Sequence, residues 1–343
     1  MRNLAWLLLL AACATVDAHA SEPTPSSAAG SEQASSPSVA TEPAVPNIAY
    51  HQHLFSARTS ELIKLPVYDA TALLADLDRA GIQRAVVLSM AYTYADERKN
   101  VPDRDANVRG ENDWTAAEAA RSNGRLIGFC SVNPLREAAL AEVERCTRLP
   151  NIRGLKLHFA NSGVNLRNAD HASKLAQVFA AANSAGAPII VHMRLRTSST
   201  DAYGAEDAQL FIDKLLPAAP NVAVQIAHLA GAGSFPEDAE MAMNVFAEAI
   251  SRDDSRTRNV YFDVTTVAMS GTTKADGDYI AKAIRSVGVE RVLFGSDAPF
   301  EGNPPPGEAW SLFTNKVPLS EAEFRTIANN VAPYARNNSR NAR

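Results

Sequence analysis

The chain has 343 residues, of which 46% are hydrophobic, and a formal net charge of −5. This length and composition allow one large domain or two small ones. The mild acidity, with a pI near 5.8, argues against a nucleic-acid-binding surface.

The first residues are typical of an export signal. Arg2 precedes an apolar run over residues 4–12, which is too short to span a bilayer and reads as a secretion signal. The run ends in Leu10-Ala11-Ala12-Cys13, which resembles a bacterial lipobox, whose cysteine carries lipid and becomes the mature N-terminus. We therefore expect a lipoprotein signal over residues 1–20.

The lipobox interpretation has one alternative, an ordinary signal peptide cut near Ala18-His19-Ala20, which also has a small-x-small pattern. Lipidation at Cys13 is favoured because the cysteine directly follows the apolar run. Ala14 stands next to it, where an Asp would resemble an inner-membrane retention signal. We therefore expect a periplasmic protein anchored in the outer membrane.

Residues 21–46 consist mainly of Ser, Pro, Ala, Glu and Thr with almost no large apolar side chain. Such a segment cannot bury enough surface to offset the entropy of ordering the chain. We predict a disordered linker between the membrane and a folded domain at residues 47–343.

From residue 47 onward, short apolar runs alternate with helical patterns. The expected strands are residues 48–53, 84–89, 126–132, 152–158, 188–192, 222–228, 260–265 and 292–297. The expected helices are residues 69–80, 135–148, 170–184, 205–216, 238–251 and 276–287. This alternation predicts the α/β class and a (β/α)8 TIM barrel. A doubly wound open sheet is the alternative. Such a fold would be expected to have a phosphate-binding glycine loop after the first strand, and the sequence has none there.

Two long polar stretches follow strands, at residues 92–113 and 194–204. In a barrel such loops lie over the catalytic face, so we expect loops that can close as lids. Plain solvated insertions are the alternative.

Polar side chains end several of the expected strands. His51 and His53 lie two apart on the first strand and therefore point to the same face. The corresponding residues on later strands are Lys156, His158, His192, His228 and Asp297. In a barrel these positions meet at the C-terminal rim, where such enzymes keep their chemistry. Imidazole favours zinc, iron, nickel or copper, so the pattern predicts a metal site.

The motifs around these residues resemble a known family. They are His51-Gln52-His53, Gly154-Leu155-Lys156-Leu157-His158, Val191-His192, Ala227-His228-Leu229-Ala230-Gly231 and Phe294-Gly295-Ser296-Asp297-Ala298-Pro299. In this order they are similar to the amidohydrolase-related metal-dependent hydrolases, from about residue 47 to the C-terminus. The resemblance implies a TIM barrel of the amidohydrolase superfamily with a divalent metal, often zinc. The family includes hydrolases and also decarboxylases of aromatic or unsaturated acids.

Matching the motifs of the family to this sequence residue by residue implies specific roles for these residues. His51, His53, His192 and Asp297 would be metal ligands, and His228 would be the catalytic histidine, together with Asp297. Lys156 matches a lysine that is carboxylated in some branches and bridges two metals, so the number of metals stays open. Ala49 departs from the family, which usually has a non-ligand Asp two residues before the first histidine.

Residues that could contact the substrate are less directly indicated by the sequence than the metal ligands. Arg194 and Arg196 share strand-like parity with His192 and could grip a substrate carboxylate, since guanidinium binds carboxylates in a fork. Solubility or a surface salt bridge is the alternative. His158 and Lys156 could line the pocket.

The implied function is a metal-dependent hydrolase that activates water to cleave an ester, lactone or amide of a small molecule. The alternatives are a non-oxidative decarboxylase of an aromatic or unsaturated acid and a non-catalytic metal-binding lipoprotein. The sequence leaves the substrate and any homo-oligomer open. For Cys130 and Cys146 we expect buried free thiols, with a disulfide as the alternative that export permits.

Overall fold

A computed structural model describes residues 44–195 and 202–336. The expected signal with Cys13, nearly all of the linker, and Arg196 lie outside these residues. Within the described ranges, no helix has both the length and the apolar character needed to cross a bilayer.

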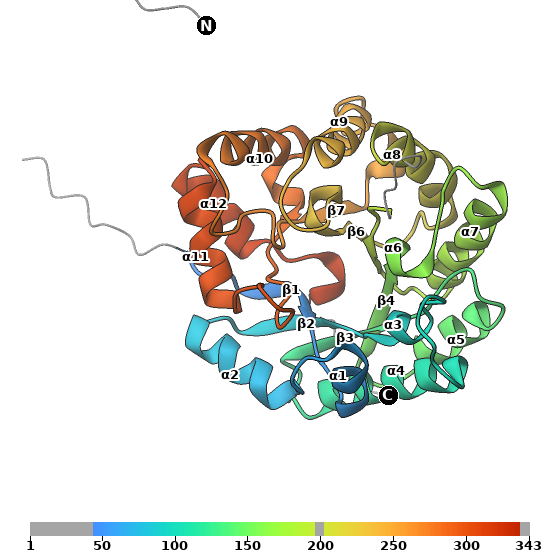
Figure 1. Cartoon of the computed structure of the whole chain (residues 1–343). Coiled ribbons are helices and arrows are strands. Elements are labelled where there is room, and N and C mark those ends of the chain that lie inside the picture. Colours follow the sequence, from blue (N-terminus) through green and yellow to red (C-terminus); the bar gives the residue numbers. More distant parts are fainter. Residues whose placement is uncertain (1–43, 196–201, 337–343) are drawn as a thin grey trace, which may run out of the picture. The chain divides into compact units, whose positions relative to one another are not determined.

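Eight parallel strands form one sheet in sequence order, which is the predicted barrel (Figure 1). The strands are β1 (Ile48–His53), β2 (Arg84–Leu88), β3 (Leu126–Ser131), β4 (Ile152–His158), β5 (Ile189–His192), β6 (Val224–Ile226), β7 (Val260–Asp263) and β8 (Val292–Leu293). The segment after β8 closes the ring onto β1, because Tyr50 N donates to Phe294 O and Asp297 N donates to His51 O at 2.9 Å.

Helices surround the strands (Figure 1). The α-helices in the described ranges are α1 (Ala57–Ile63), α2 (Ala70–Ala80), α3 (Ala91–Tyr94), α4 (Arg104–Ala120), α5 (Ala139–Cys146), α6 (Phe159–Ser162), α7 (Ala169–Ser184), α8 (Ala205–Leu210), α9 (Glu237–Ser251), α10 (Lys274–Val287), α11 (Pro306–Lys316) and α12 (Glu321–Asn329). Shorter turns of other helix types are η1 (Phe211–Leu215), η2 (Leu216–Ala218), η3 (Ala227–Ala230), η4 (Ser255–Thr257), η5 (Val289–Arg291) and η6 (Pro333–Ala335).

The helix predicted at residues 69–80 shows how local sequence sets these boundaries. The Asp69 side chain accepts a hydrogen bond from Ala72 N at 3.0 Å and caps the first turn of α2. Gly81 ends the helix in the left-handed conformation, with φ of 70°. The predicted start and stop are confirmed.

The stretch predicted as a long loop at residues 92–113 is largely helical, so that prediction is wrong. It contains α3 and the first half of α4. The buried face of α4 is polar: Asn112 Nδ2 donates to Ser131 O at 3.0 Å, and Glu118 Oε2 accepts from Ala70 N at 3.0 Å. A helix that docks through hydrogen bonds lacks the apolar stripe by which an amphipathic helix is recognised.

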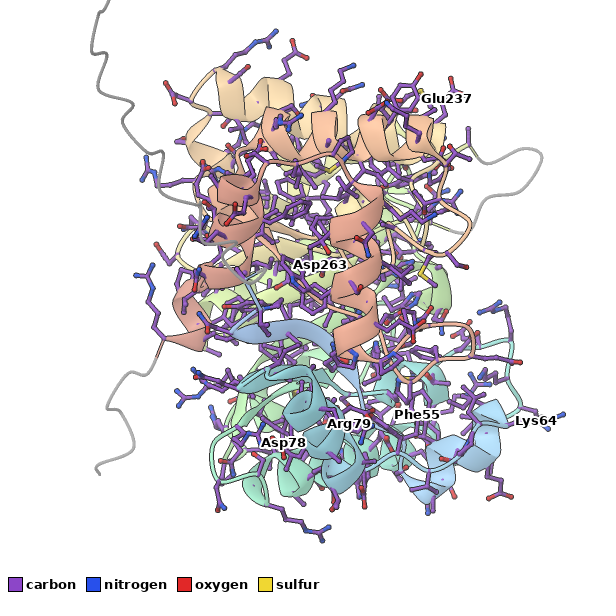
Figure 2. The ribbon with its side chains drawn as sticks, turned by 90° about the vertical axis from the view of Figure 1, so that its left-hand side faces the viewer. Phe55, Lys64, Asp78, Arg79, Glu237 and Asp263 are labelled. Carbon is purple, nitrogen blue, oxygen red and sulfur yellow. A yellow bond between two sulfur atoms is a disulfide. The ribbon has the colours of Figure 1, made fainter. Side chains whose placement is uncertain are left out.

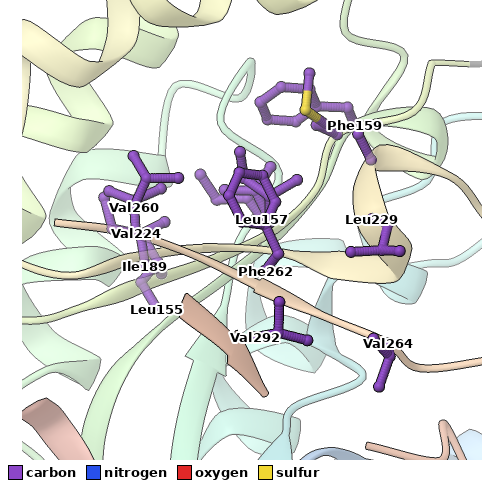
Figure 3. Packing of buried hydrophobic residues seen from close by; sticks show 14 of the residues in the cluster. Leu155, Leu157, Phe159, Ile189, Val224, Leu229, Val260, Phe262, Val264 and Val292 are labelled. Carbon is purple, nitrogen blue, oxygen red and sulfur yellow. The ribbon is translucent and has the colours of Figure 1, made fainter. Parts of the chain in front are cut away.

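The core has two parts, one on each side of the strands. The outer part packs strand side chains such as Leu155, Leu157, Ile189 and Val224 against the helices (Figure 3). The inner part fills the barrel with Ile48, Tyr50, Val86, Leu88, Ile127, Phe129, Ile190, Leu293, Ala332 and Ala335.

Cys130 and Cys146 form a disulfide, so the expectation of free thiols is wrong. Cys130 lies on β3 and Cys146 is the last residue of α5, which packs back on that strand. The packing brings the two Cα atoms to 6.1 Å, within the range that a disulfide spans.

Candidate metal centre

His51 and His53 lie side by side at the end of β1, and both are almost fully buried. Each turns its Nε2 toward the same carboxylate oxygen. The distances to Asp297 Oδ1 are 3.4 Å from His51 and 3.2 Å from His53. The two predicted ligands of β1 therefore converge on the predicted ligand that follows β8.

The other ring nitrogen of each histidine is engaged by an acceptor. His51 Nδ1 donates to Asp263 Oδ2 at 3.1 Å, and His53 Nδ1 donates to Leu88 O at 3.0 Å. A backbone carbonyl only accepts, and a carboxylate is acceptor-only when ionised, so the ring proton of each neutral imidazole is assigned to Nδ1. Each Nε2 then presents a lone pair to Asp297.

The charge of Asp297 is fixed by its neighbours. Burial alone would raise the pKa of its carboxyl, but the neighbouring His53, His51 and His228 hold that pKa well below its usual range. Asn303 Nδ2 donates to Asp297 Oδ2 at 3.0 Å, which leaves Oδ1 facing the histidines.

These atoms fit a divalent cation. Burial, reinforced by the charge of Lys156, lowers the pKa of His51 to about 3, and burial lowers the pKa of His53. Near neutral pH, two imidazole lone pairs therefore face an ionised oxygen, an arrangement that a cation between them stabilises. Ligand atoms around one zinc ion at about 2.0–2.2 Å lie roughly 3.0–3.6 Å apart, and the distances from Asp297 Oδ1 to each of the two histidines fall in this range. In the described residues, the three potential ligands whose atoms all lie within 4.8 Å of one another are His51, His228 and Asp297.

His228 lies on an unusual turn directly after β6. The strand was predicted to run to residue 228 but ends at Ile226, and His228, Leu229 and Ala230 all have positive φ, at 56°, 47° and 62°. Asp263 Oδ1 accepts from His228 N at 2.9 Å and holds the turn. The side chain thus enters the site from a strained loop rather than from a strand.

The ring of His228 is oriented by the segment after β7. Its Nδ1 lies 2.9 Å from Thr265 O, a carbonyl that requires the proton on Nδ1. A ring nitrogen of His228, a ring nitrogen of His51 and a carboxylate oxygen of Asp297 lie within 4.8 Å of one another. The predicted catalytic histidine is therefore beside the predicted metal ligands.

His192, the remaining predicted ligand, lies at the end of β5 next to these groups. Its ring stacks on that of His158, with 4.0 Å between centroids, and lies 5.1 Å from the ring of His228. His158 also packs against Tyr92, at 4.8 Å between ring centroids. Both histidines are thus part of the same cluster of rings.

Lys156 is buried beside the first ligand. Its Nζ lies 3.3 Å from His51 Nε2. Burial lowers the pKa of Lys156 to about 8, although the charges of Asp297 and Asp263 oppose this shift. The shift increases the fraction of neutral amine near neutral pH, although most of the lysine stays protonated. The neutral amine is the form of a lysine that reacts with carbon dioxide.

Arg194 is engaged in an ion pair. It pairs with Asp238 near the start of α9, and its guanidinium lies 5.8 Å from the centroid of the Tyr203 ring. The ring of Phe300 lies 5.1 Å from that of His53. Tyr92 lies 6.5 Å from His53 as well, so aromatic rings border this ligand.

The sequence interpretation missed two residues that position the site, Asp263 and Asn303. Asp263, labelled in Figure 2, is fully buried and binds His51, the backbone of His228 and Gln225 Nε2. The signal for Asp263 was present: it is the lone acidic residue of β7 and ends that strand. Asn303 lies in a loop, where nothing in the sequence distinguishes it.

Known proteins resemble this barrel over most of the chain. The family model described as Amidohydrolase matches residues 48–331. No curated protein sequence matches the chain.

Solved structures of similar fold include two decarboxylases and a hydrolase. The 5-carboxyvanillate decarboxylase from Sphingomonas paucimobilis is 14% identical, with a TM-score of 0.57 over 83% of this chain and 97% of that one. The enzyme of the same name from Novosphingobium aromaticivorans, with bound manganese, is 15% identical, with a TM-score of 0.55 over 86% and 98%. A probable 2-pyrone-4,6-dicarboxylic acid hydrolase from Acinetobacter baumannii is 15% identical, with a TM-score of 0.54 over 82% and 96%. At these identities the likeness shows a shared fold.

Proposed function

The chain belongs to the amidohydrolase family, and from this premise we propose that it is a metal-dependent hydrolase of a small-molecule ester, lactone or amide. The observation that carries the proposal is the convergence of His51 Nε2 and His53 Nε2 on Asp297 Oδ1, with a ring nitrogen of His228 close by. This is a set of metal ligands with a proton-transfer group beside it.

The proposed ligands are His51, His53, His192 and Asp297, and the proposed metal is zinc. Bound there, a divalent metal would supply a nucleophile near neutral pH by lowering the pKa of a water molecule. Asp263 and the Leu88 carbonyl hold the two β1 imidazoles in the tautomer that leaves Nε2 free.

His228 is the proposed acid–base residue. Its Nδ1 carries the proton that binds Thr265 O, so Nε2 is the atom that can take up a proton. Burial of the cluster excludes bulk water, because His51, His53 and His228 are each at most 3% exposed. In such surroundings a fixed imidazole is an effective partner for proton transfer.

A specific observation favours hydrolysis over decarboxylation. A decarboxylase needs a cationic side chain that can bind the carboxylate of its substrate. Arg194, the described candidate for this role, is already paired with Asp238. The decarboxylase stays the second candidate because Tyr92 and Phe300 border His53 and could contact an aromatic acid. Arg196, the other predicted carboxylate contact, lies outside the described residues.

One experiment separates these functions. A panel of esters, lactones, amides and aromatic carboxylic acids is assayed with the protein as purified, after chelation, and after return of zinc or manganese. Hydrolysis incorporates oxygen from water into the product, whereas decarboxylation releases carbon dioxide. Loss of activity on chelation and recovery with metal is expected. Stoichiometric metal without turnover on any member of the panel would favour a non-catalytic metal-binding protein.

We further propose that the protein is exported and anchored to the outer membrane through Cys13. The support is the lipobox-like sequence together with the Cys130–Cys146 disulfide, since structural disulfides persist in oxidising compartments such as the periplasm. Cys13→Ser should move the protein from the membrane to the soluble periplasmic fraction. An unchanged membrane fraction for this variant would refute the anchor.

A further inference from the structure

A second cavity lies at the opposite end of the barrel from the metal centre. Its volume is about 330 Å³, and it is bordered by the segments that lead into β5 and β6 and by the C-terminal segment. The lining side chains that matter here are Arg153, Tyr334 and Arg336. Both arginines are exposed, so a solute can reach them.

Among the described residues, the lining of the cavity carries positive charge and no acidic side chain. Within the described ranges, neither Arg153 nor Arg336 forms an ion pair. By contrast, Arg145 pairs with both Glu142 and Asp113. The chain as a whole carries a net charge of −5, so this local excess of positive charge is not a general property of the surface.

A third arginine adds to the charge. Arg84, at the start of β2, donates through Nη1 to Ala335 O at 2.7 Å, next to Tyr334 in the chain. Its Nε is buried and has no hydrogen-bond partner in the part of the chain that the structure describes. Burial lowers the pKa of Arg84; the charge of Tyr50 opposes this shift and the charge of Arg153 adds to it.

The floor of the cavity is rigid. The Tyr334 ring packs edge-on against Tyr50 and Phe129, at 5.9 Å and 5.4 Å between centroids. Its hydroxyl donates to Gln225 Oε1. A fixed floor reduces the ordering that is left for the moment of binding.

We propose that this cavity binds a phosphate group between Arg153 and Arg336. Guanidinium groups bind phosphate oxygens through paired, charge-assisted hydrogen bonds. A bound dianion would also offset the positive charge that these arginines bring to the cavity. The phosphate group can belong to a free small molecule or to a lipid headgroup, since both present the same oxygens. This site is independent of the proposed hydrolase activity.

The test measures binding of inorganic phosphate to the metal-loaded protein by calorimetry at low salt, and of vesicles that contain phosphatidylglycerol by sedimentation. The proteins are the wild type, Arg153→Gln, Arg336→Gln and the double variant. Each single change is expected to weaken binding roughly tenfold or more, and the double change to abolish it. Saturable binding of phosphate alone identifies a free ligand, whereas binding of vesicles alone identifies a headgroup.

Two controls make the result specific. Lys274→Gln removes the same charge from an exposed position at the start of α10 and should bind as the wild type does. Phosphate also coordinates metals, so elemental analysis must show equal metal content in all variants. Only the part of the phosphate binding that is lost in the double variant is assigned to the cavity. Binding that persists in the double variant, or the absence of binding to both probes in the wild type, would overturn the proposal.

Discussion

The carboxylate of Asp263 accepts a hydrogen bond from His51 Nδ1 at 3.1 Å, and both side chains are almost completely buried. Asp263 stays ionised: burial alone would raise its pKa, but the charge and hydrogen bond of His51 hold it well below its usual range. This pair orients the first metal ligand and raises its basicity.

Asp263→Asn should therefore weaken metal binding without removing a ligand. An uncharged amide accepts the His51 hydrogen bond less strongly, and changes of this kind cost about 10- to 100-fold in metal affinity. Competition with a chromogenic chelator gives the dissociation constant. Asp253→Asn, at an exposed position, is the matched control and should bind metal normally. Equal affinities for the two variants would show that Asp263 does not position the ligand.

His228→Asn should separate catalysis from metal binding. The amide can still occupy the left-handed turn, but it cannot take up a proton as imidazole does. We expect the metal content to be retained and kcat to fall by at least ~10²-fold, the usual scale for an acid–base residue. His171→Asn, at the start of α7, should keep wild-type activity. Near wild-type turnover in the His228 variant would exclude His228 from proton transfer.

The Cys130–Cys146 disulfide should stabilise the barrel. It closes a loop with a sequence separation of 16, for which chain-entropy estimates give about 3 kcal/mol. Urea unfolding of the oxidised and the reduced wild type measures the difference in unfolding free energy. The Cys130→Ala, Cys146→Ala double variant should unfold near the reduced protein. Coincident unfolding curves for the two redox forms would contradict the prediction.

The ion pair between Glu323 and Arg285 predicts a pH dependence. The hydrogen bonds from Arg285, with help from Ser320, lower the pKa of Glu323 to about 2. A carboxyl whose pKa is depressed in the folded state stabilises it above the unfolded pKa, here 4.5, and loses that effect as the pH falls toward 2. Glu323→Gln should therefore cost up to about 1 kcal/mol at pH 7, because the pair is partly solvated, and much less at pH 2.5.

Unfolding of both proteins at the two pH values measures this dependence. Glu301→Gln, an exposed glutamate without an ion pair in the described part of the chain, should show no such difference. A cost for Glu323→Gln that is the same at both pH values would mean that the lost contacts are not electrostatic.

The barrel could be predicted because its strands are short, apolar and separated by amphipathic helices. β1 and β4 have the predicted bounds. α4 was missed because it buries Glu111, Asn112 and Glu118, polar side chains whose partners lie on other elements. A sequence pattern reports burial only where the buried residues are apolar.

In the site, too, some residues could be predicted from local sequence patterns and others could not. His51 and His53 could be predicted as ligands from their spacing on β1, and Asp297 could be predicted from its position directly after a strand. The role of Asn303 depends on a loop that brings its amide 3.0 Å from Asp297 Oδ2, and a loop path is not encoded in local periodicity. The disulfide likewise depends on the path between β3 and α5, which spacing alone does not decide.

The turn at His228, Leu229 and Ala230 has a consequence for protein engineering. Three successive residues other than glycine adopt left-handed backbone conformations there, and each costs of the order of 1–3 kcal/mol when the surroundings enforce it. A histidine grafted onto the end of a barrel strand in another scaffold would not reproduce the position of His228. A transplant must carry Asp263, which binds the turn, along with the whole 228–230 segment.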